Sequence, residues 1–238
     1  MTRRIGLLMT NTDESAFANR HPRDGEKFST LMHAVRPDWS MTVYSVKDGQ
    51  FPLTVKEVDG FIITGSPASV HDEASWVEKL MSFIRQLDEA VVPTVGCCFG
   101  HQAIAKALGG KVERNPSGWQ FSAADTFFNV PQDWMQPHAK TLTLFAAHNE
   151  QVTLLPQHAI ALGGNDDCPF ASFQVGQHFF TTQYHPEMTA EFVTALSYEI
   201  EKYVGVDLAE TARTQARSTT HGLWFAEWMA EFLEKDRT

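Results

Sequence analysis

Two cysteines stand side by side in the segment GCCFG, residues 96–100. A Gly-x-nucleophile-x-Gly pattern between a strand and a helix is typical of a tight turn that presents a catalytic side chain. Cys98 has glycine two positions away on both sides, whereas Cys97 has Val95 and Phe99 at those positions. The spacing therefore predicts Cys98 as the nucleophile and Cys97 as a small buried residue. The N-terminus of the following helix would stabilise a thiolate at Cys98.

The segment TTQYHPEMT, residues 181–189, offers the base that a catalytic cysteine needs. Pro186 disfavours helical geometry at His185, so this stretch is expected to be extended. Residues two apart in an extended chain point to the same side, so Glu187 can orient the imidazole of His185. A nucleophile, a base and an orienting carboxylate form a catalytic triad. Each motif has a structural alternative: GCCFG can be a glycine-rich turn with two core cysteines, and His-Pro-Glu can be a surface turn.

Acyl transfer also requires hydrogen-bond donors for the oxyanion that forms on the attacked carbonyl. The backbone N–H of Phe99, the residue after the nucleophile, is the first expected donor. The loop ITGSPASV, residues 63–70, can supply a second donor at Gly65 or Ser66, although a plain turn is the alternative for this composition. In open α/β sheets, ligands bind beyond the carboxyl ends of the strands, where both loops are expected to lie.

The sequence predicts alternating strands and helices that would position these residues. Continuous apolar runs predict strands over residues 4–10, 42–46, 60–64 and 91–96, and apolar residues at helical spacing predict helices over 26–35, 75–90 and 101–110. This alternation indicates a mostly parallel sheet with helices on both faces. Several short strand-like runs between residues 111 and 183 suggest an antiparallel extension or additional strands. The chain is expected to be helical from Ala190, with a break near residues 216–222.

Composition narrows the function classes. The chain has 238 residues, 43% of them hydrophobic, which predicts one large domain over residues 1–238. The formal net charge of −10 argues against nucleic-acid and membrane partners. An odd number of cysteines (three) without CxxC spacing argues against a disulfide framework or zinc site. The N-terminal apolar run is too short for a signal peptide, so we expect a cytoplasmic protein.

The motifs, in this order, resemble class I glutamine amidotransferases of the Cys-His-Glu type, and are most similar to free-standing members that resemble the glutaminase half of GMP synthase. The segments that carry the resemblance are DGFIITGSPASVHD, GCCFGHQAIAKALGG, NPSGWQFS, AAHNEQVTLLP and QYHPE. The resemblance implies a flavodoxin-like α/β fold without a metal or organic cofactor. It also implies that Cys98 attacks a γ-carboxamide to form a thioester, with His185 as general base and acid and Glu187 as its orienting partner.

The same resemblance suggests substrate-binding residues. Gln102 matches a family glutamine that helps to hold the amino-acid end of the substrate, although a solvent-facing helix residue is the alternative. His148, Asn149 and Glu150 match a segment where the family often has His-Gly-Asp, and an acid there can meet the substrate ammonium. Two departures are notable. Glu150 is longer than the usual aspartate, and Ser66 follows Gly65 where the family commonly has a second glycine.

Three functions fit these observations: a self-contained hydrolase of glutamine or γ-glutamyl compounds, a glutaminase subunit that supplies ammonia to a separate synthase, and a non-catalytic regulatory protein on the same fold. The intact triad argues against the third.

The apolar segment 222–233 is predicted to pack in the core through Leu223, Trp224, Trp228 and Phe232, with a docking surface as the alternative. The six tryptophans are expected to be packing residues. Surface or packing roles are expected for seven histidines: His21, His33, His71, His138, His158, His178 and His221.

Overall fold

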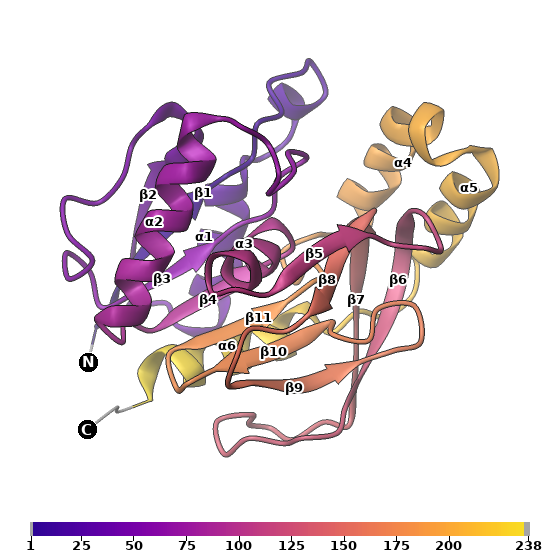
Figure 1. The fold of residues 1–238 in the computed structure, drawn as a ribbon. Helices are drawn as coiled ribbons and strands as arrows, with labels where there is room; N and C mark the ends of the chain where they lie inside the picture. The colour runs from indigo at the N-terminus through magenta and orange to yellow at the C-terminus, as the bar shows by residue number, and fades with distance from the viewer. Residues whose placement is uncertain (1, 236–238) are drawn as a thin grey trace.

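A nine-stranded sheet forms the centre of the computed structural model, which describes residues 2–235 (Figure 1). Its strand order is β2-β1-β3-β4-β11-β10-β9-β6-β7. The first five strands in this order are parallel to one another: β2 (Ser40–Ser45), β1 (Arg4–Met9), β3 (Gly60–Ile63), β4 (Thr94–Cys97) and β11 (Phe179–Thr182). The remaining four continue the sheet as antiparallel strands: β10 (Ser172–Val175), β9 (Ala159–Gly164), β6 (Gln120–Phe128) and β7 (Thr141–His148).

Helices cover both faces of the parallel half. On one face lie α1 (Asp24–Val35) and α6 (Gly222–Glu234), and on the other α2 (Ser75–Glu89) and α3 (Phe99–Ala107). A hairpin of α4 (Ala190–Val204) and α5 (Val206–Gln215) packs beside β6 and β7 (Figure 1), and the short helices η1 (Ala18–Arg20) and η2 (Val46–Asp48) lie in connections. The predicted α/β class with helices on both faces is confirmed, as is the antiparallel extension.

The alternation of side chains along each strand explains the two hydrophobic layers. Leu7 and Ile62 are register partners and belong to the cluster under α1 and α6. Leu8 and Ile63, one residue further along, belong to the cluster under α2 and α3. Because successive strand residues point to opposite faces, a continuous apolar run buries both sides of the sheet. The predicted catalytic loops therefore leave the parallel half from strands that are packed on both faces.

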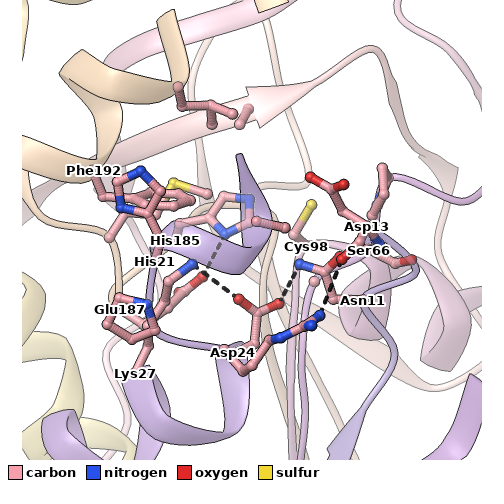
Figure 2. Close-up of a pocket in the computed structure, with 18 of the residues that line it drawn as sticks. Asn11, Asp13, His21, Asp24, Lys27, Ser66, Cys98, His185, Glu187 and Phe192 are labelled. Atoms are coloured by element: carbon pink, nitrogen blue, oxygen red, sulfur yellow. Dashed lines mark hydrogen bonds and ion pairs between the residues drawn. The ribbon is translucent and has the colours of Figure 1, made fainter. Parts of the chain in front are cut away.

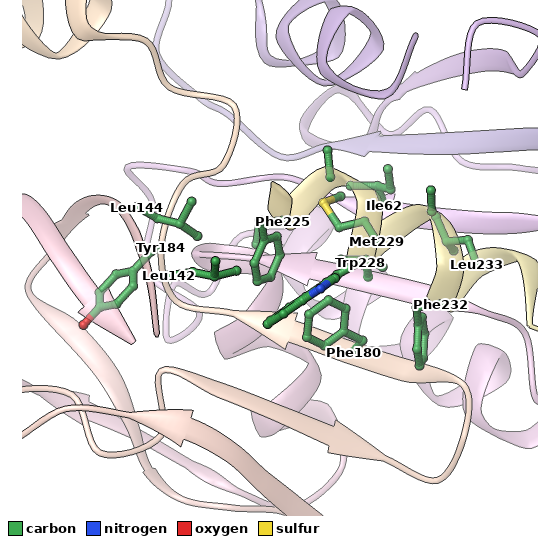
Figure 3. Packing of buried hydrophobic residues seen from close by; sticks show 14 of the residues in the cluster. Ile62, Leu142, Leu144, Phe180, Tyr184, Phe225, Trp228, Met229, Phe232 and Leu233 are labelled. Atoms are coloured by element: carbon green, nitrogen blue, oxygen red, sulfur yellow. The ribbon is translucent and has the colours of Figure 1, made fainter. Parts of the chain in front are cut away.

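The C-terminal helix α6 packs in the core as predicted, but the prediction that Leu223 and Trp224 pack there was wrong. Trp228 and Phe232 are fully buried, among the residues that Figure 3 shows against Phe180. Leu223 is 59% exposed and Trp224 is 36% exposed. The helical repeat turns Phe225 inward instead, because residues 225, 228, 229 and 232 share one face.

Salt bridges hold the outer side of α6 to the end of α1. The guanidinium of Arg36 lies 2.8 Å from the carboxylate of Glu227, 2.9 Å from that of Glu231 and 3.0 Å from that of Glu234. Burial alone would lower the pKa of Arg36, but the carboxylates of Glu234 and Glu227 raise it above its ordinary value. These ion pairs hold α6 against the end of α1, and its opposite face is buried on the sheet, so segment 222–233 is a core element.

A separate two-stranded sheet was not predicted. It pairs β5 (Lys111–Arg114) with β8 (Glu150–Leu154) in antiparallel register, and Arg114 lies opposite Glu150. Both strands are short and mostly polar, so hydrophobic periodicity did not reveal them. Their pairing brings a basic and an acidic side chain to the same edge of the molecule.

Candidate active site

The turn between β4 and α3 carries Cys98 in a strained conformation. Its backbone has φ +49° and ψ −103°, which non-glycine residues rarely adopt. A side chain at Gly100 would collide with the backbone carbonyl of Ile63, so only glycine allows α3 to begin this close to β3. Strain of this kind persists only where the surrounding structure imposes it, and it is common at functional sites. The turn thus has the geometry expected of a nucleophile elbow.

The two thiols differ in their surroundings. Cys97 is fully buried in the hydrophobic layer that includes Val95 and Ile62. Burial, reinforced by the charges of Glu187 and Cys98, raises the pKa of Cys97 well above its ordinary value. Cys98 is 5% exposed and lines two cavities. The spacing argument and the burial therefore agree in assigning solvent access to Cys98 alone of the pair.

His185 and Glu187 lie where the chain leaves β11. The backbone N–H of His185 donates to the carbonyl of Phe145 on β7, which fixes the extended segment. His185 Nδ1 lies 2.7 Å from Glu187 Oε1, and both side chains are buried. Figure 2 shows the His185 ring between Glu187 and the Cys98 thiol. The imidazole thus has a carboxylate on one side and the candidate nucleophile on the other.

The charge balance at His185 favours the imidazolium. Burial alone would lower the pKa of His185, but the charge of Glu187 and the interaction with Cys98 outweigh it and hold the pKa of His185 well above its ordinary value. A thiolate beside an imidazolium is an activated nucleophile next to a proton donor. The chemistry that this arrangement allows is acyl transfer through a thioester.

The loop after β3 lies directly against the pair. A Cβ added at Gly65 would come within 2.9 Å of His185 Cε1 and 3.5 Å of Cys98 Cβ. Thr10, at the end of β1, anchors this loop: its backbone N–H donates to Thr64 Oγ1 at 3.1 Å, and its hydroxyl donates to the Gly65 carbonyl at 2.9 Å. The sequence analysis did not identify Thr10, because its partners are contributed by a neighbouring strand.

The predicted oxyanion donors lie on both sides of Cys98. Phe99 is the first residue of α3, where the backbone N–H has no partner within the helix. Ser66 and Gly65 line a cavity together with Cys98. The positions are compatible with the predicted roles of Gly65, Ser66 and Phe99, which stay a prediction.

The four predicted substrate-binding residues line a cavity of about 290 Å³, the Gln102 cavity, which Cys98 also borders. Gln102 is 4% exposed, so it does not face solvent; its amide donates to the Glu150 carbonyl at 2.7 Å. The Glu150 carboxylate accepts a hydrogen bond from Ser69 at 2.8 Å. His148 and Asn149 complete the predicted set at the end of β7. Gln102 thus supports the segment that bears Glu150.

The lining of the Gln102 cavity also contains residues that were not predicted for the site, among them Asp72, Arg114 and Trp119. Trp119 is partly exposed and lines both cavities that Cys98 lines, so it departs from the expectation that all six tryptophans are packing residues. It lies in the segment NPSGWQFS that carried part of the family resemblance. Arg114 could have been found only through its pairing with Glu150 across β5 and β8.

Two further histidines of the site, His101 and His148, are buried. His101 donates or accepts a hydrogen bond with Thr181 Oγ1 at 2.9 Å. Burial, and then the charge of His148, lowers the pKa of His101 to about 3. Burial, and then the charge of His185, lowers the pKa of His148 to about 3. Both rings are therefore neutral in the folded protein near neutral pH.

His101→Asn is expected to make the protein less sensitive to acid. Between pH 6.5 and about 3, the unfolded chain protonates this histidine and the folded chain does not, so stability falls as the pH falls. The slope is at most about 1.4 kcal/mol per pH unit for each such histidine. Urea unfolding at about pH 7 and about pH 5 measures it. The exposed His138→Asn is the control. If the free energy of unfolding falls between about pH 7 and about pH 5 by as much in His101→Asn as in the wild type, this interpretation is wrong.

Neither metal ligation nor membrane insertion is indicated by the described residues. No group of three or more histidine, cysteine or acidic side chains within residues 2–235 is placed to hold a metal ion. None of the described helices is long and apolar enough to cross a membrane.

Comparison with known proteins identifies the family. The family profile "Glutamine amidotransferase class-I" matches residues 29–193. Gamma-glutamyl peptidase 3 of Arabidopsis thaliana is 31% identical over 199 residues, which cover 80% of this chain and 79% of the relative. A GMP synthase of Azoarcus sp. (strain BH72) is 30% identical over 146 residues, 55% of this chain and 26% of the synthase.

A solved structure supports the same fold. A glutamine amidotransferase from Thermotoga maritima superimposes with a TM-score of 0.79 at 17% identity, covering 99% of this chain and 100% of that one. The arrangement of Cys98, His185 and Glu187 at the ends of parallel strands lies within the segment that the family profile matches. The chain belongs to the class I glutamine amidotransferase family.

Proposed function

We propose that this protein hydrolyses γ-glutamyl amides through a thioester on Cys98. The observation that carries the proposal is the His185 ring, hydrogen-bonded to Glu187 and lying between it and Cys98 beside a cavity that all three residues border (Figure 2). Membership of the amidotransferase family and the similarity to a gamma-glutamyl peptidase support the same substrate class.

Each step of the proposed reaction assigns a proton to a named group. The Cys98 thiolate attacks the γ-carbonyl carbon, and the carbonyl oxygen takes the negative charge beside the Phe99 and Gly65 loops. His185 donates its proton to the leaving nitrogen, the C–N bond breaks, and a γ-glutamyl thioester and a free amine form. His185 then takes a proton from water, the hydroxide attacks the thioester, and glutamate leaves while the Cys98 thiolate is restored.

The glutamyl half of the substrate is proposed to occupy the Gln102 cavity. Arg114 and Glu150 border this cavity with opposite charges, which complement the α-carboxylate and α-ammonium of a glutamyl group. Gln102, His148 and Asn149 form the remainder of its wall. All three cysteines are free thiols, in keeping with the cytoplasm as the proposed compartment.

A glutaminase subunit is the alternative function. Its support is the similarity to GMP synthases, of which the matched part is about a quarter of the length. We favour independent turnover, because the proposed nucleophile, base, orienting carboxylate and oxyanion donors all belong to one chain. No nucleic-acid or membrane partner is proposed.

The purified chain is expected to release glutamate from glutamine or γ-glutamyl dipeptides without a second protein. Coupled detection of glutamate at steady state is the measurement, with Cys98→Ser as the blank for contaminating activity. Turnover that appears only after a cell extract or a synthase is added would support the subunit alternative and contradict independent turnover.

A further inference from the structure

Two cavities meet at Cys98 and differ in which catalytic side chains they contain. The Gln102 cavity includes neither His185 nor Glu187. The other, which we call the His185 cavity, has a volume of about 190 Å³ and is bordered by Cys98, His185 and Glu187 (Figure 2). Trp119 and the loop containing Ser66 border both cavities. An amide bound across Cys98 therefore has space on either side of its scissile bond.

Proton transfer determines which half of the substrate occupies which cavity. The leaving nitrogen must come within hydrogen-bond reach of His185 to receive a proton. That nitrogen and the group attached to it consequently lie on the His185 side, and the acyl half lies on the Gln102 side. If ammonia were the leaving group, most of the His185 cavity would remain unfilled, because about 190 Å³ is several times the ~30 Å³ that a water-sized molecule occupies.

One side of the His185 cavity is apolar and is built from distant parts of the chain, whereas residues 11–27 add polar and charged side chains to the lining. The loop around η1 contributes Phe17, and the segment leading into and along α4 contributes Met188, Phe192, Leu196 and Ile200. The Phe192 ring lies 5.9 Å from that of Phe17, measured between centroids. These side chains offer a surface suited to an aromatic or branched aliphatic group.

Neighbouring polar groups hold Phe192 in place and neutralise one another. Lys27 Nζ lies 3.6 Å above the Phe192 ring centroid, and the His21 ring meets its edge at 5.3 Å. Asp24 is 6% exposed and accepts hydrogen bonds from Lys27 at 3.1 Å and from Asn11 at 2.9 Å. The buried carboxylate of Asp24 is therefore paired. Arg23, which also lines the cavity, donates to the Asp13 carbonyl at 3.2 Å and to Asn19 Oδ1 at 2.7 Å, so its positive charge is not matched by an ion pair among the described residues. His21, expected to be a surface or packing residue, is part of this support.

We infer that the His185 cavity is a leaving-group subsite, and that the preferred substrates are γ-glutamyl amides of amino acids with aromatic or branched aliphatic side chains. The inference rests on the proposed function. It predicts a higher kcat/KM for γ-glutamyl-phenylalanine than for glutamine, by at least about 10- to 200-fold, the range that a single methylene contributes in a hydrophobic pocket.

The test compares γ-glutamyl-phenylalanine, γ-glutamyl-glycine and glutamine with wild-type enzyme and variants. Phe192→Ala and, as a second variant, Leu196→Ala should lower the ratio of kcat/KM for γ-glutamyl-phenylalanine to that for glutamine by about 10-fold or more. Tyr198→Ala, on the same helix but 68% exposed and outside the cavity, is the matched control and should leave the ratio unchanged.

The outcomes separate this inference from the proposed function. Equal kcat/KM for the three substrates, or equal losses on all of them in Phe192→Ala and Leu196→Ala, would overturn the subsite while hydrolysis itself stands. Absence of turnover with every γ-glutamyl substrate would overturn both. A preference for γ-glutamyl-phenylalanine that both variants reduce supports the subsite.

Discussion

Cys98→Ala is expected to abolish hydrolysis, with a fall in kcat of about 10⁶-fold, the order seen when the nucleophile of a comparable triad is removed. Cys97→Ala should retain most of the activity. The reason is the difference in their surroundings: Cys98 borders both cavities, whereas Cys97 is fully buried among apolar residues. Steady-state glutamate release from the better of the tested substrates measures both variants.

Covalent labelling tests the same assignment by a different observable. An electrophilic glutamine analogue should modify Cys98 alone, and peptide mass spectrometry locates the adduct. Cys97→Ala is the control, because it should still be labelled. An adduct on Cys97, or full activity of Cys98→Ala, would show that the elbow has been assigned to the wrong thiol.

The second large effect is expected at the base. His185→Ala should lose about 10²- to 10⁴-fold in kcat/KM, the usual contribution of a positioned general acid–base group. Glu187→Gln should be impaired less, because the amide oxygen can still accept the hydrogen bond from His185 Nδ1 that the carboxylate accepts at 2.7 Å. Steady-state kinetics over a range of pH compares the two variants.

The pH profile distinguishes a catalytic role of Glu187 from a structural one. The negative charge of Glu187 raises the pKa of His185. Glu187→Gln removes that charge, so the pKa of His185 falls and the imidazolium is lost at a lower pH. The alkaline limb of kcat/KM should therefore shift to lower pH. Small and equal losses in His185→Ala and Glu187→Gln without such a shift would mean that the pair only supports the fold.

Local sequence patterns were sufficient for the parts of the site that depend on neighbours along the chain. The elbow has no room for large side chains two residues before and after Cys98, so glycine is required at both positions. Pro186 disfavours helical geometry at His185. Both motifs could therefore be predicted without knowledge of the fold. The strands that precede them have apolar runs long enough to be recognised. The same logic failed for Leu223 and Trp224, because a helix that is apolar on most sides does not reveal which face is buried.

From the sequence alone, alternating apolar patterns predicted the α/β class, which the structure confirms. Steric rules over a few residues favoured Cys98 over Cys97 and paired His185 with Glu187. Only the tertiary structure decided what surrounds them. Thr10 reaches the Gly65 loop across neighbouring strands, and Phe192 meets Lys27 although 165 positions separate them in the sequence. Contacts of this kind depend on strand order and helix placement, and the periodicity of the sequence does not reveal either. The two cavities beside Cys98 are built from such contacts.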